Sequence, residues 1–474
     1  MADHDLLVLG GGTGGYAAAF RASQLGKRVA LIEQAKVGGT CLHWGCIPAK
    51  AMLETGDLLA KIGKASDFGI QITPATGIDA TVVGARRDKI VARMHAGLKS
   101  LFKKNNVELI AGRATLLGGG SVEVALYDES GTATGEKKTI SATDIVIATG
   151  SSVRRIPGLE TDGRVIVDSD QITTGTLKPS SVIVIGGGAV GCEFASYFRD
   201  LGAETTIVEM LPTLVPLEDR DASKELTRAF TKRGIAIHVA HRIKEGSLVK
   251  RADGVDLQIE PIDGGEVVAL SADLLVVAAG RVPNSGEIGL EKTKATVERG
   301  FIKVDAQMQT TEPHLYAVGD VIGGLQLAHV AAHEGMIAAH AIAGEPLHAM
   351  DYVKQPRATY CRPEVASVGY TTQELERDGV PFVAGQVPFL AIAKAHVGGD
   401  ADGFCKVLRH AESGVILGVH MVGPKVTDLI AEASLAMELG ATAAQVGGTT
   451  HPHPTLSEIV GEAALVSIGR SVNF

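Results

Sequence analysis

Two stretches of the chain share one pattern, DLLVLGGGTGG at residues 5–15 and SVIVIGGGAVG at residues 181–191. Each has an apolar run of strand length, a turn of glycines and then an alanine-rich segment with helical spacing. A second apolar run follows in each copy and ends in an acid, Glu33 or Glu209. The first glycine and the acid are equally far apart in both copies, because 33 − 10 = 23 and 209 − 186 = 23. The sequence therefore predicts one β-α-β unit that is present twice.

Each copy continues to a further apolar strand that ends in Ala-x-Gly, at residues 144–150 and 273–280. The first copy is longer by about 46 residues, since 150 − 10 = 140 and 280 − 186 = 94. A turn-rich link at residues 151–160 separates the copies. The two copies are therefore expected to be separate α/β domains.

The last part of the chain has a different pattern of expected strands and helices. A short strand and turn are expected at residues 315–320, and a helix follows at residues 327–343. From about residue 350, alternating strands are followed by helices expected at residues 426–439 and 455–464. This order predicts a separate α+β unit.

The composition is that of a globular protein of 474 residues, or roughly three compact units. The net charge, 45 − 54 = −9, opposes nucleic acid as the main partner. No apolar run approaches the roughly 20 residues that span a bilayer. The acidic start, Met-Ala-Asp-His-Asp, resembles neither a signal nor a transit peptide. We therefore expect a cytoplasmic protein without nucleic-acid or membrane partners, or a mitochondrial matrix protein if a transit peptide has been removed.

The glycines of each copy have the spacing G-x-G-x-x-G directly after a strand. The first makes the tight turn, the second lets the backbone approach a pyrophosphate, and the third allows close packing of helix and strand. The helix N-terminus attracts the phosphates, and the acid accepts hydrogen bonds from ribose hydroxyls. These glycines are Gly10, Gly12 and Gly15, then Gly186, Gly188 and Gly191.

Two such loops predict two Rossmann-like dinucleotide-binding domains, for which flavin and nicotinamide dinucleotides are the economical pair. Glu209 would repel a 2′-phosphate, and no arginine follows it before Arg220. The second dinucleotide is therefore expected to be NAD rather than NADP.

Cys41 and Cys46 lie five positions apart in GGTCLHWGCIPAK, at residues 38–50. Structural zinc sites need a second pair of ligands, and the other three cysteines are isolated, so no metal site is expected. Five residues of straight helix rise about 7.5 Å, which is too far for a relaxed disulfide. If the two cysteines bond, the helix start must be distorted. Strained, accessible disulfides tend to be redox-active. The remaining cysteines, Cys192, Cys361 and Cys405, are interpreted as small core residues.

Together these residues resemble the pyridine nucleotide-disulfide oxidoreductases, over nearly the whole chain. Within that family the chain is most similar to the members that oxidise dihydrolipoyl groups with NAD⁺. The motifs occur in the family's order: residues 38–50, both glycine loops, LYAVGD at 315–320, LAH at 327–329 and HPHPTLSE at 451–458. The resemblance implies an α/β fold with two Rossmann-like dinucleotide-binding domains and a C-terminal α+β dimerisation domain.

The resemblance also implies a division of labour along the chain. The expected segments are residues 1–150 for FAD binding, 151–281 for NAD binding, 282–349 for a central segment completing the FAD site, and 350–474 for the dimer interface. A homodimer with an active site shared between chains is implied, together with lipoyl domains of a 2-oxoacid dehydrogenase complex or glycine cleavage system as partners. Cys41 would be the interchange thiol and Cys46 the sulfur nearer the flavin.

His453 and Glu458 match the family's proton-transferring histidine and the carboxylate that orients it. From the residues alone, Glu458 fits equally a capping box, T-x-x-E at residues 455–458. The resemblance favours the catalytic role. His451 is interpreted as structural.

The resemblance assigns further positions to the cofactors. Lys50 and Glu193 match a buried ion pair beside the flavin, and Asp320 matches the residue that binds the ribityl chain. Positions expected at FAD or NAD are Gly10, Gly12, Gly15, Glu33, Thr40, Lys50, Thr149, Gly150, Asp320, Ala328, Gly186, Gly188, Gly191, Glu193, Glu209 and Gly280.

The chain departs from the family's usual pattern between the cysteines. His43-Trp44 stands where Asn-Val is usual, and Ala49 stands where serine is usual. Trp44 either lines the thiol pocket or packs behind it.

Two other functions are weighed. A reductase of another disulfide, of the glutathione or mercuric type, is opposed by Glu209 and by a chain end without a cysteine pair. A flavin-bearing scaffold or redox-sensing subunit is opposed by the retention of both cysteines, His453 and Glu458.

Overall fold

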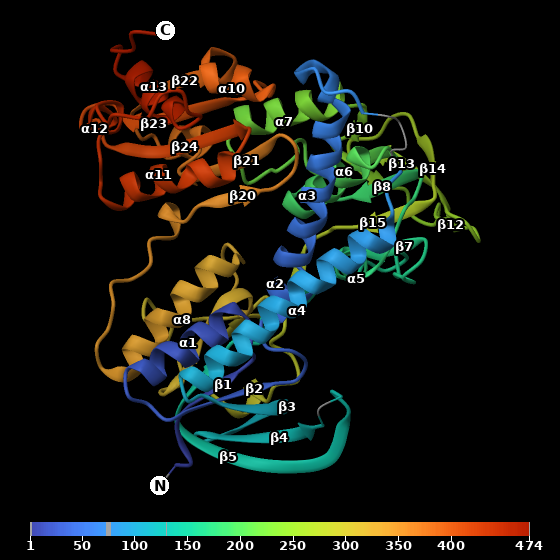
Figure 1. The fold of residues 1–474 in the computed structure, drawn as a ribbon. Helices are drawn as coiled ribbons and strands as arrows, with labels where there is room; N and C mark the ends of the chain where they lie inside the picture. The colour runs from blue at the N-terminus through green and yellow to red at the C-terminus, as the bar shows by residue number, and fades with distance from the viewer. Residues whose placement is uncertain (1, 73–76, 129, 474) are drawn as a thin grey trace. The chain divides into compact units, whose positions relative to one another are not determined.

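The computed structural model describes residues 2–72, 77–128 and 130–473 (Figure 1). The chain forms two compact units, each assembled from separate stretches. The first unit comprises Met1–Ala51, Thr81–Arg154 and Arg281–Met350, and the second comprises Met52–Ala80, Arg155–Gly280 and Asp351–Phe474. In the described part of the chain, no helix is both long enough and apolar enough to cross a membrane.

The first unit is built on five parallel strands in the order β3-β2-β1-β5-β19. Their bounds are His4–Leu9 for β1, Val29–Glu33 for β2, Glu108–Gly118 for β3, Ala133–Ile147 for β5 and Leu315–Ala317 for β19. Strand β1 is central, and its apolar residues Leu6–Leu9 are fully buried, as expected for a parallel strand covered on both faces. Strand β4, Ser121–Tyr127, joins β3 and β5 in an antiparallel meander.

Two helices of the first unit, α1 (Thr13–Gln24) and α8 (Ala328–Ala343), lie side by side (Figure 1). A Cβ on Gly14 would lie 3.0 Å from the Ala331 carbonyl oxygen, so the two backbones approach closely. Small residues are therefore required at this crossing, which is one reason for the high glycine and alanine content. The observed α8 confirms the helix expected at residues 327–343.

The extra residues of the first copy form the helices between β2 and β3. That interval is 108 − 33 = 75 positions, whereas the matching interval between β9 and β10 is 235 − 208 = 27. The inserted helices are α2 (Gly39–His43), α3 (Cys46–Gly63), η1 (Ala65–Phe68) and α4 (Ala80–Lys104). Both cysteines of the predicted redox pair therefore lie in the insertion.

The second unit repeats the parallel sheet, with the order β10-β9-β8-β15-β7. The strands are Ile166–Asp168 (β7), Ser181–Ile185 (β8), Glu204–Val208 (β9), Ile235–His238 (β10) and Leu274–Val277 (β15). Helix α6, Ala189–Asp200, follows the second glycine loop, and α7, Arg220–Lys232, follows β9. The predicted repeat is confirmed, because β15 pairs with β8 as β5 pairs with β1. The edge strands differ: β7 precedes its glycine loop, whereas β19 comes far after the other.

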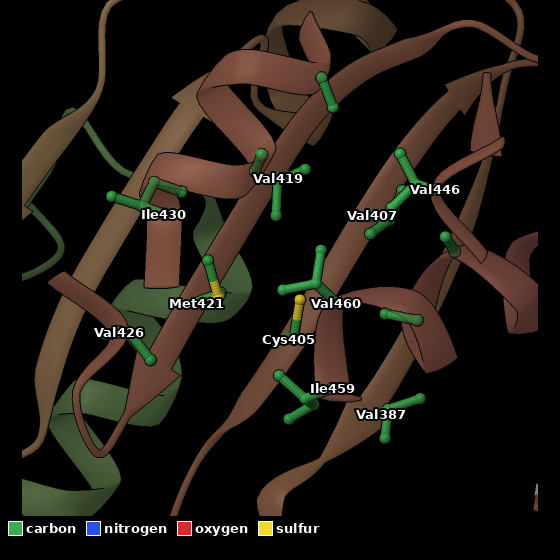
Figure 2. Packing of buried hydrophobic residues seen from close by; sticks show 14 of the residues in the cluster. Val387, Cys405, Val407, Val419, Met421, Val426, Ile430, Val446, Ile459 and Val460 are labelled. Carbon is green, nitrogen blue, oxygen red and sulfur yellow. The ribbon is translucent and has the colours of Figure 1, made fainter. Parts of the chain in front are cut away.

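The C-terminal part of the second unit is an antiparallel sheet in the order β20-β21-β24-β23-β22. Its strands are Arg357–Thr359, Glu364–Gly369, Phe382–Pro388, Phe404–His410 and Ile416–Gly423 for β20 to β24. Helices α11 (Val426–Glu438), α12 (Ala443–Gly447) and α13 (Glu458–Ser467) supply the rest of its apolar core (Figure 2). The expected α+β unit is thus present.

Helix α13 begins at Glu458, three residues later than expected from the sequence. The Thr455 hydroxyl donates to the Pro452 carbonyl oxygen, 2.8 Å away, instead of capping the helix. Its backbone N–H donates to the Glu458 carboxylate at 2.9 Å. Residues 455–457 therefore form a turn before the helix.

Candidate active site

The first glycine loop, between β1 and α1, has the conformation that a dinucleotide requires. Gly10 has φ +107°, a value that side chains other than glycine's rarely permit. A Cβ on Gly15 would overlap the Gly10 carbonyl oxygen, so only glycine allows this approach of helix and strand. A Cβ on Gly12 would meet nothing within 4 Å. The face of the loop at Gly12 is thus open where a pyrophosphate would approach.

The second loop, between β8 and α6, repeats this geometry. Gly186 has φ +109°, and a Cβ on Gly191 would overlap the Gly186 carbonyl oxygen. Gly188 precedes α6 and its face is open to 4 Å, as at Gly12. Neither glycine has a side chain that could cap the helix, so the first-turn N–H groups and the positive end of the helix dipole suit a phosphate. Both loops therefore fit a dinucleotide.

Glu33, the acid that ends β2, folds back onto its own glycine loop. Its Oε2 accepts a hydrogen bond from the Gly11 N–H at 2.6 Å, and its Oε1 accepts one from the Ala35 N–H at 2.7 Å. Burial raises the pKa of Glu33, and these N–H donors oppose that rise. A carboxylate has about four lone-pair positions, so hydrogen bonds to a ribose remain feasible. The sequence did not indicate that this acid also fixes its own loop.

Glu209 has the same role at the end of β9. Its Oε2 accepts from the Gly187 N–H at 2.5 Å, and its Oε1 accepts from the Leu211 N–H at 2.7 Å. Arg220, the first arginine after it, pairs instead with Glu376, with Nη1 and Oε2 2.8 Å apart. Arg220 is therefore paired with another residue, and the contact of Glu209 with an NAD ribose stays a prediction.

The two glycine positions of the second loop allow a matched test. We expect Gly188→Ala to leave the melting temperature near that of the wild type but to weaken NADH binding at least about 10-fold, because its Cβ would enter the pyrophosphate site. Gly191→Ala is expected to prevent stable folding, because its Cβ would overlap the Gly186 carbonyl oxygen. Thermal melting and NADH titration check both; normal NADH binding by a folded Gly188→Ala variant would contradict the assignment.

Asp320 lies in η3 (Gly319–Ile322), directly after β19. Its Oδ2 accepts a hydrogen bond from the Ser151 hydroxyl at 2.5 Å. The Arg281 Nε donates to the same hydroxyl at 2.6 Å and lies 3.8 Å from the Asp320 Oδ2. Ser151 and Arg281 were missed in the sequence, although each directly follows one of the Ala-x-Gly strand ends.

Other residues expected at the cofactors lie at the ends of elements. The Thr149 hydroxyl donates to the Asn284 carbonyl oxygen at 2.7 Å, which ties the end of β5 to the segment after β16 (Arg281–Pro283). Gly150 and Gly280 both have positive φ and open faces. Ala328 is the first residue of α8, and Thr40 lies in α2. Their contacts with FAD or NAD stay predictions.

The redox cysteines lie on either side of a helix break. Cys41 is in α2, Cys46 begins α3, and the residues between them interrupt the helix. This is the distortion that the spacing required. In this structure the two cysteines are not joined by a disulfide, as in the reduced form of the pair. The pKa of the Cys41 thiol lies far above its usual range, because it hydrogen-bonds to the Cys46 thiol and is buried, although Lys50 and the Thr13 hydroxyl oppose the rise.

The two thiols lie close enough to titrate as a pair, and burial together with the hydrogen bond with Cys46 disfavours a thiolate at Cys41. Cys46 stands at the N-terminus of an 18-residue helix, whose dipole favours a thiolate. The arrangement therefore favours a protonated Cys41 beside a Cys46 thiolate.

The two unusual residues between the cysteines are placed differently. His43 is buried, and its Nε2 donates to the Val37 carbonyl oxygen at 3.0 Å. Its ring lies 4.9 Å from that of His95 in an edge-on arrangement and 5.3 Å from that of Trp44. Burial lowers the pKa of both histidines, so both favour the neutral form. His43 is thus a packing residue of the insertion, whereas Trp44 is only half-buried.

His453 and Glu458 form a histidine–carboxylate pair. The His453 Nδ1–H donates to the Glu458 Oε1 at 2.9 Å, and 72% of the His453 side chain is exposed. Burial raises the pKa of Glu458, but hydrogen bonds from His453 and the Thr455 N–H outweigh this and hold it below its usual value. The carboxylate fixes the tautomer that leaves the lone pair on Nε2. Of the expected capping box, only the bond from the Thr455 N–H is present.

A second pair of the same type lies two residues earlier. His451 donates through Nε2 to the Glu432 Oε1 at 2.7 Å, and only 11% of its side chain is exposed. Its ring lies against Gly461, where a Cβ would approach to 2.9 Å. This burial agrees with the structural interpretation of His451. Cys192, Cys361 and Cys405 are also buried, as expected for core residues.

Lys50 belongs to the first unit and Glu193 to the second. Glu193 is buried in α6, and its Oε1 accepts from the Tyr360 N–H at 2.9 Å. Lys50 lies in α3 near enough to Cys41 to act on its ionisation. Their ion pair stays a prediction.

Comparisons with known proteins agree over the whole chain. Residues 4–335 match the family described as pyridine nucleotide-disulphide oxidoreductase, and residues 355–464 match that family's dimerisation domain. Dihydrolipoyl dehydrogenase of Bacillus subtilis is 42% identical over 100% of this chain and 99% of its own, and that of Zymomonas mobilis is 41% identical over 100% of both. The crystal structure of LpdA from Mycobacterium tuberculosis superposes with a TM-score of 0.89 at 27% identity, covering 97% of this chain and 98% of the other.

Proposed function

Because the chain belongs to the pyridine nucleotide-disulphide oxidoreductase family, we propose that it oxidises protein-bound dihydrolipoyl groups with NAD⁺. It is a flavin disulfide oxidoreductase, and its cofactors are FAD and NAD(H). The observation that carries the proposal is the adjacent thiol pair at the start of α3. Full-length identity to proteins named dihydrolipoyl dehydrogenase supports the choice of substrate.

The loop at Gly10–Gly15 would hold the FAD pyrophosphate and Glu33 its ribose. Asp320, fixed by Ser151, would bind the ribityl chain. The loop at Gly186–Gly191 and Glu209 would hold NAD⁺ in the same way. When bound, FAD would supply a two-electron acceptor for the thiol pair, and NAD⁺ would supply the final hydride acceptor. Under these assignments residues 1–150 bind FAD and residues 151–281 bind NAD. Residues 282–349 form the central segment that completes the FAD site, and residues 350–474 form the dimer interface.

In the oxidised enzyme Cys41 and Cys46 form a disulfide. His453 of the partner subunit removes a proton from a dihydrolipoyl thiol, and the thiolate attacks the Cys41 sulfur. Cys46 leaves as a thiolate, and a mixed disulfide joins the substrate to Cys41. The second substrate thiol then displaces Cys41 and closes the lipoyl disulfide, and its proton is taken up by the histidine in exchange for the one returned to Cys41. The histidine returns a proton to Cys41, whose raised pKa favours the thiol.

The match to the dimerisation domain supports a homodimer, and the exposed His453 would complete the partner's site. Lipoyl domains of a 2-oxoacid dehydrogenase complex or of a glycine cleavage system would be the macromolecular substrates. The bacterial relatives support a cytoplasmic location.

One assay tests the proposed reaction. Purified protein with FAD, dihydrolipoamide and NAD⁺ is expected to form NADH with ping-pong kinetics, because the thiol pair separates the two half-reactions. NADP⁺ should support at least about 10-fold less turnover, because Glu209 would repel its 2′-phosphate. Protein that is inactive in this assay but reduces glutathione disulfide with NADPH would be a reductase of another disulfide. Protein that binds FAD and is inactive in both assays would instead be a scaffold.

A further inference from the structure

The second glycine loop is closed by a buried residue with an unusual backbone conformation. Val215 has φ +41°, in the left-handed region where a β-branched residue is an outlier. Its N–H donates to the Gly187 carbonyl oxygen at 2.7 Å. The Leu214 side chain lies 2.8 Å from where a Cβ of Gly187 would stand. Residues 214–215 thus pack directly on the loop.

The first glycine loop has the same closing contact but uses a glycine. The Gly38 N–H donates to the Gly11 carbonyl oxygen at 2.7 Å, and Gly38 has φ +106°. The spacings agree to within one residue, since 38 − 11 = 27 and 215 − 187 = 28. The Val37 side chain lies 3.2 Å from where a Cβ of Gly11 would stand, just as Leu214 lies beside the same position of Gly187. Only in the second copy does a β-branched residue have a positive φ. The residues around Val215 must therefore stabilise this conformation.

The segment after Val215 is held from the start of α7. The Val215 carbonyl oxygen accepts from the Glu218 N–H at 2.9 Å and from the Ser223 hydroxyl at 3.3 Å. Asp219 follows as the N-cap of α7, and its carboxylate accepts from the Asp221 N–H. The position of Val215 therefore depends on where this helix begins.

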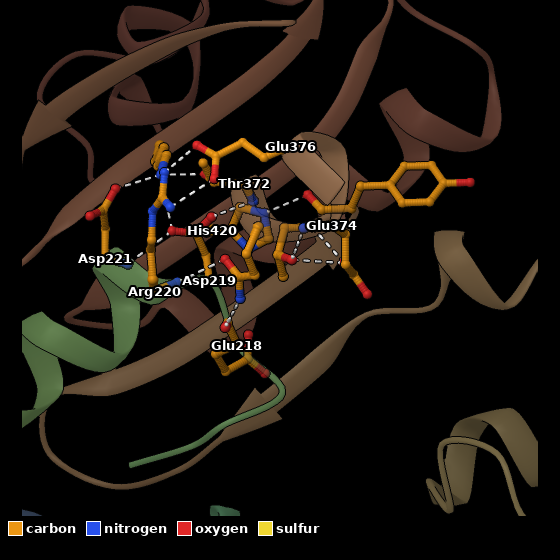
Figure 3. A network of polar contacts seen from close by, with 12 residues as sticks. Glu218, Asp219, Arg220, Asp221, Thr372, Glu374, Glu376 and His420 are labelled. Atoms are coloured by element: carbon orange, nitrogen blue, oxygen red, sulfur yellow. Dashed lines mark hydrogen bonds and ion pairs between the residues drawn. The ribbon is translucent and has the colours of Figure 1, made fainter. Parts of the chain in front are cut away.

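Asp219 belongs to a polar cluster, named here the Lys406 cluster: Lys406, Asp219, Asp221 and Thr372. Figure 3 labels Asp219, Asp221 and Thr372 of this cluster. The Lys406 ammonium donates to the Asp219 Oδ1 at 3.0 Å, the Asp221 Oδ2 at 2.5 Å and the Thr372 hydroxyl at 2.6 Å. The Thr372 N–H donates to the other Asp219 oxygen at 2.8 Å. All three ammonium donors are thus used.

Lys406 and Asp219 are the buried charged pair of the Lys406 cluster, whereas Asp221 is partly exposed. The exposed fraction of the side chain is 4% for Lys406 and 0% for Asp219. Burial raises the pKa of Asp219, but His420, hydrogen bonds from Thr372 and the Lys406 charge hold it well below its usual value. Removing the ammonium would therefore leave a buried, uncompensated carboxylate, and the start of α7 would move toward water.

We propose that Lys406 is a positioning residue for the second dinucleotide: through Asp219 it holds Val215 in its left-handed conformation against Gly187. The inference rests on the proposed function, in which this loop binds NAD⁺. Gly187 lies between the two glycines that turn and open the loop, so losing its contact with Val215 would displace the pyrophosphate site. The expected loss is in nucleotide affinity, whereas reduction of the enzyme by dihydrolipoamide should be unaffected.

The test uses the full-length, FAD-loaded protein and three variants. Lys406→Met removes the ammonium, and Thr372→Val removes one of its acceptors while keeping the side-chain shape. Arg220→Ala is the matched control, because it breaks the exposed Arg220–Glu376 link between the same helices, α7 and α9 (Thr372–Arg377). The readouts are hydrogen exchange of the Val215 amide without nucleotide and the Kd for NADH.

We expect Lys406→Met to speed exchange at Val215 and to weaken NADH binding, each about 10-fold or more. Thr372→Val should shift both in the same direction by about 3-fold, and Arg220→Ala should leave both within 2-fold. Val215→Gly added to Thr372→Val should restore NADH affinity, because glycine adopts positive φ without strain.

If Lys406→Met does not fold, Thr372→Val and its combination with Val215→Gly decide the question. The proposal is overturned if Thr372→Val or Lys406→Met lowers the melting temperature while Val215 exchange and NADH affinity stay at wild-type values, since the cluster would then be only structural. Wild-type protein that fails to bind NADH would refute the proposed function instead, and the exchange experiment would still report on the role of Lys406.

Discussion

Cys46→Ser is expected to lower turnover of dihydrolipoamide with NAD⁺ by on the order of 10³-fold or more, because the redox disulfide can no longer form. It should also abolish the long-wavelength absorbance of the two-electron-reduced enzyme, which needs a thiolate beside the flavin. We expect that thiolate to be Cys46, because burial and the hydrogen bond with Cys46 raise the pKa of the Cys41 thiol.

Steady-state assays and absorbance spectra of the reduced protein measure these two effects. Cys405→Ala is the matched control: it removes a buried cysteine of the C-terminal core and should keep turnover within about 2-fold, with a modest loss of stability. Oxidation of NADH by an artificial acceptor should survive in Cys46→Ser, because it needs only the nucleotide sites. Persistence of the long-wavelength band in Cys46→Ser would show that the two sulfurs are assigned in the wrong order.

His453→Gln is expected to lower the rate of enzyme reduction by dihydrolipoamide by about 10² to 10⁴-fold, the usual contribution of a positioned general base. The structure supports this role because Nδ1 is tied to Glu458 and the lone pair of the neutral ring is on Nε2. Glu458→Gln should cost less, roughly 10 to 100-fold, because an amide oxygen can still orient the ring but cannot stabilise its positive charge.

Stopped-flow measurement of flavin reduction separates these effects from those on NAD⁺. Glu432→Gln is the matched control, since it alters the other histidine–carboxylate pair, Glu432 with His451. That variant should melt at a lower temperature but reduce its flavin at nearly the wild-type rate. Equal losses in Glu432→Gln and Glu458→Gln would mean that both acids only support the local fold, and the proposed base would then be wrong.

The sequence predicted the two nucleotide domains because their signal is local. A strand, a glycine turn and a helix lie within about 30 residues, and each glycine is required by a steric contact inside that segment, as at Gly10 and Gly15. The pairing of His453 with Glu458 was expected from the family resemblance, because the residues alone fitted a capping box equally well, and the structure brings the two side chains together. The start of α13 was placed wrongly, because the Thr455 hydroxyl had a closer acceptor in the Pro452 carbonyl.

Contacts between residues that are far apart in the chain could not be predicted from the sequence. The edge strand of each sheet comes from a different part of the chain, β19 in the first and β7 in the second, and no local pattern distinguishes them. Ser151 and Arg281, which fix Asp320, come from two other strand ends.

The sequence by itself determined that this protein has two dinucleotide loops and a closely spaced cysteine pair, because each is encoded by residues close together in the chain. The histidine–carboxylate pair was inferred from the family resemblance. Only the tertiary structure decided how the second loop is held. Lys406 and Asp219 are 187 positions apart, and Val215 gives no sign in the sequence of its positive φ. A buried charge pair and a left-handed valine are stable only when the folded chain brings their partners together, so no local propensity could predict them.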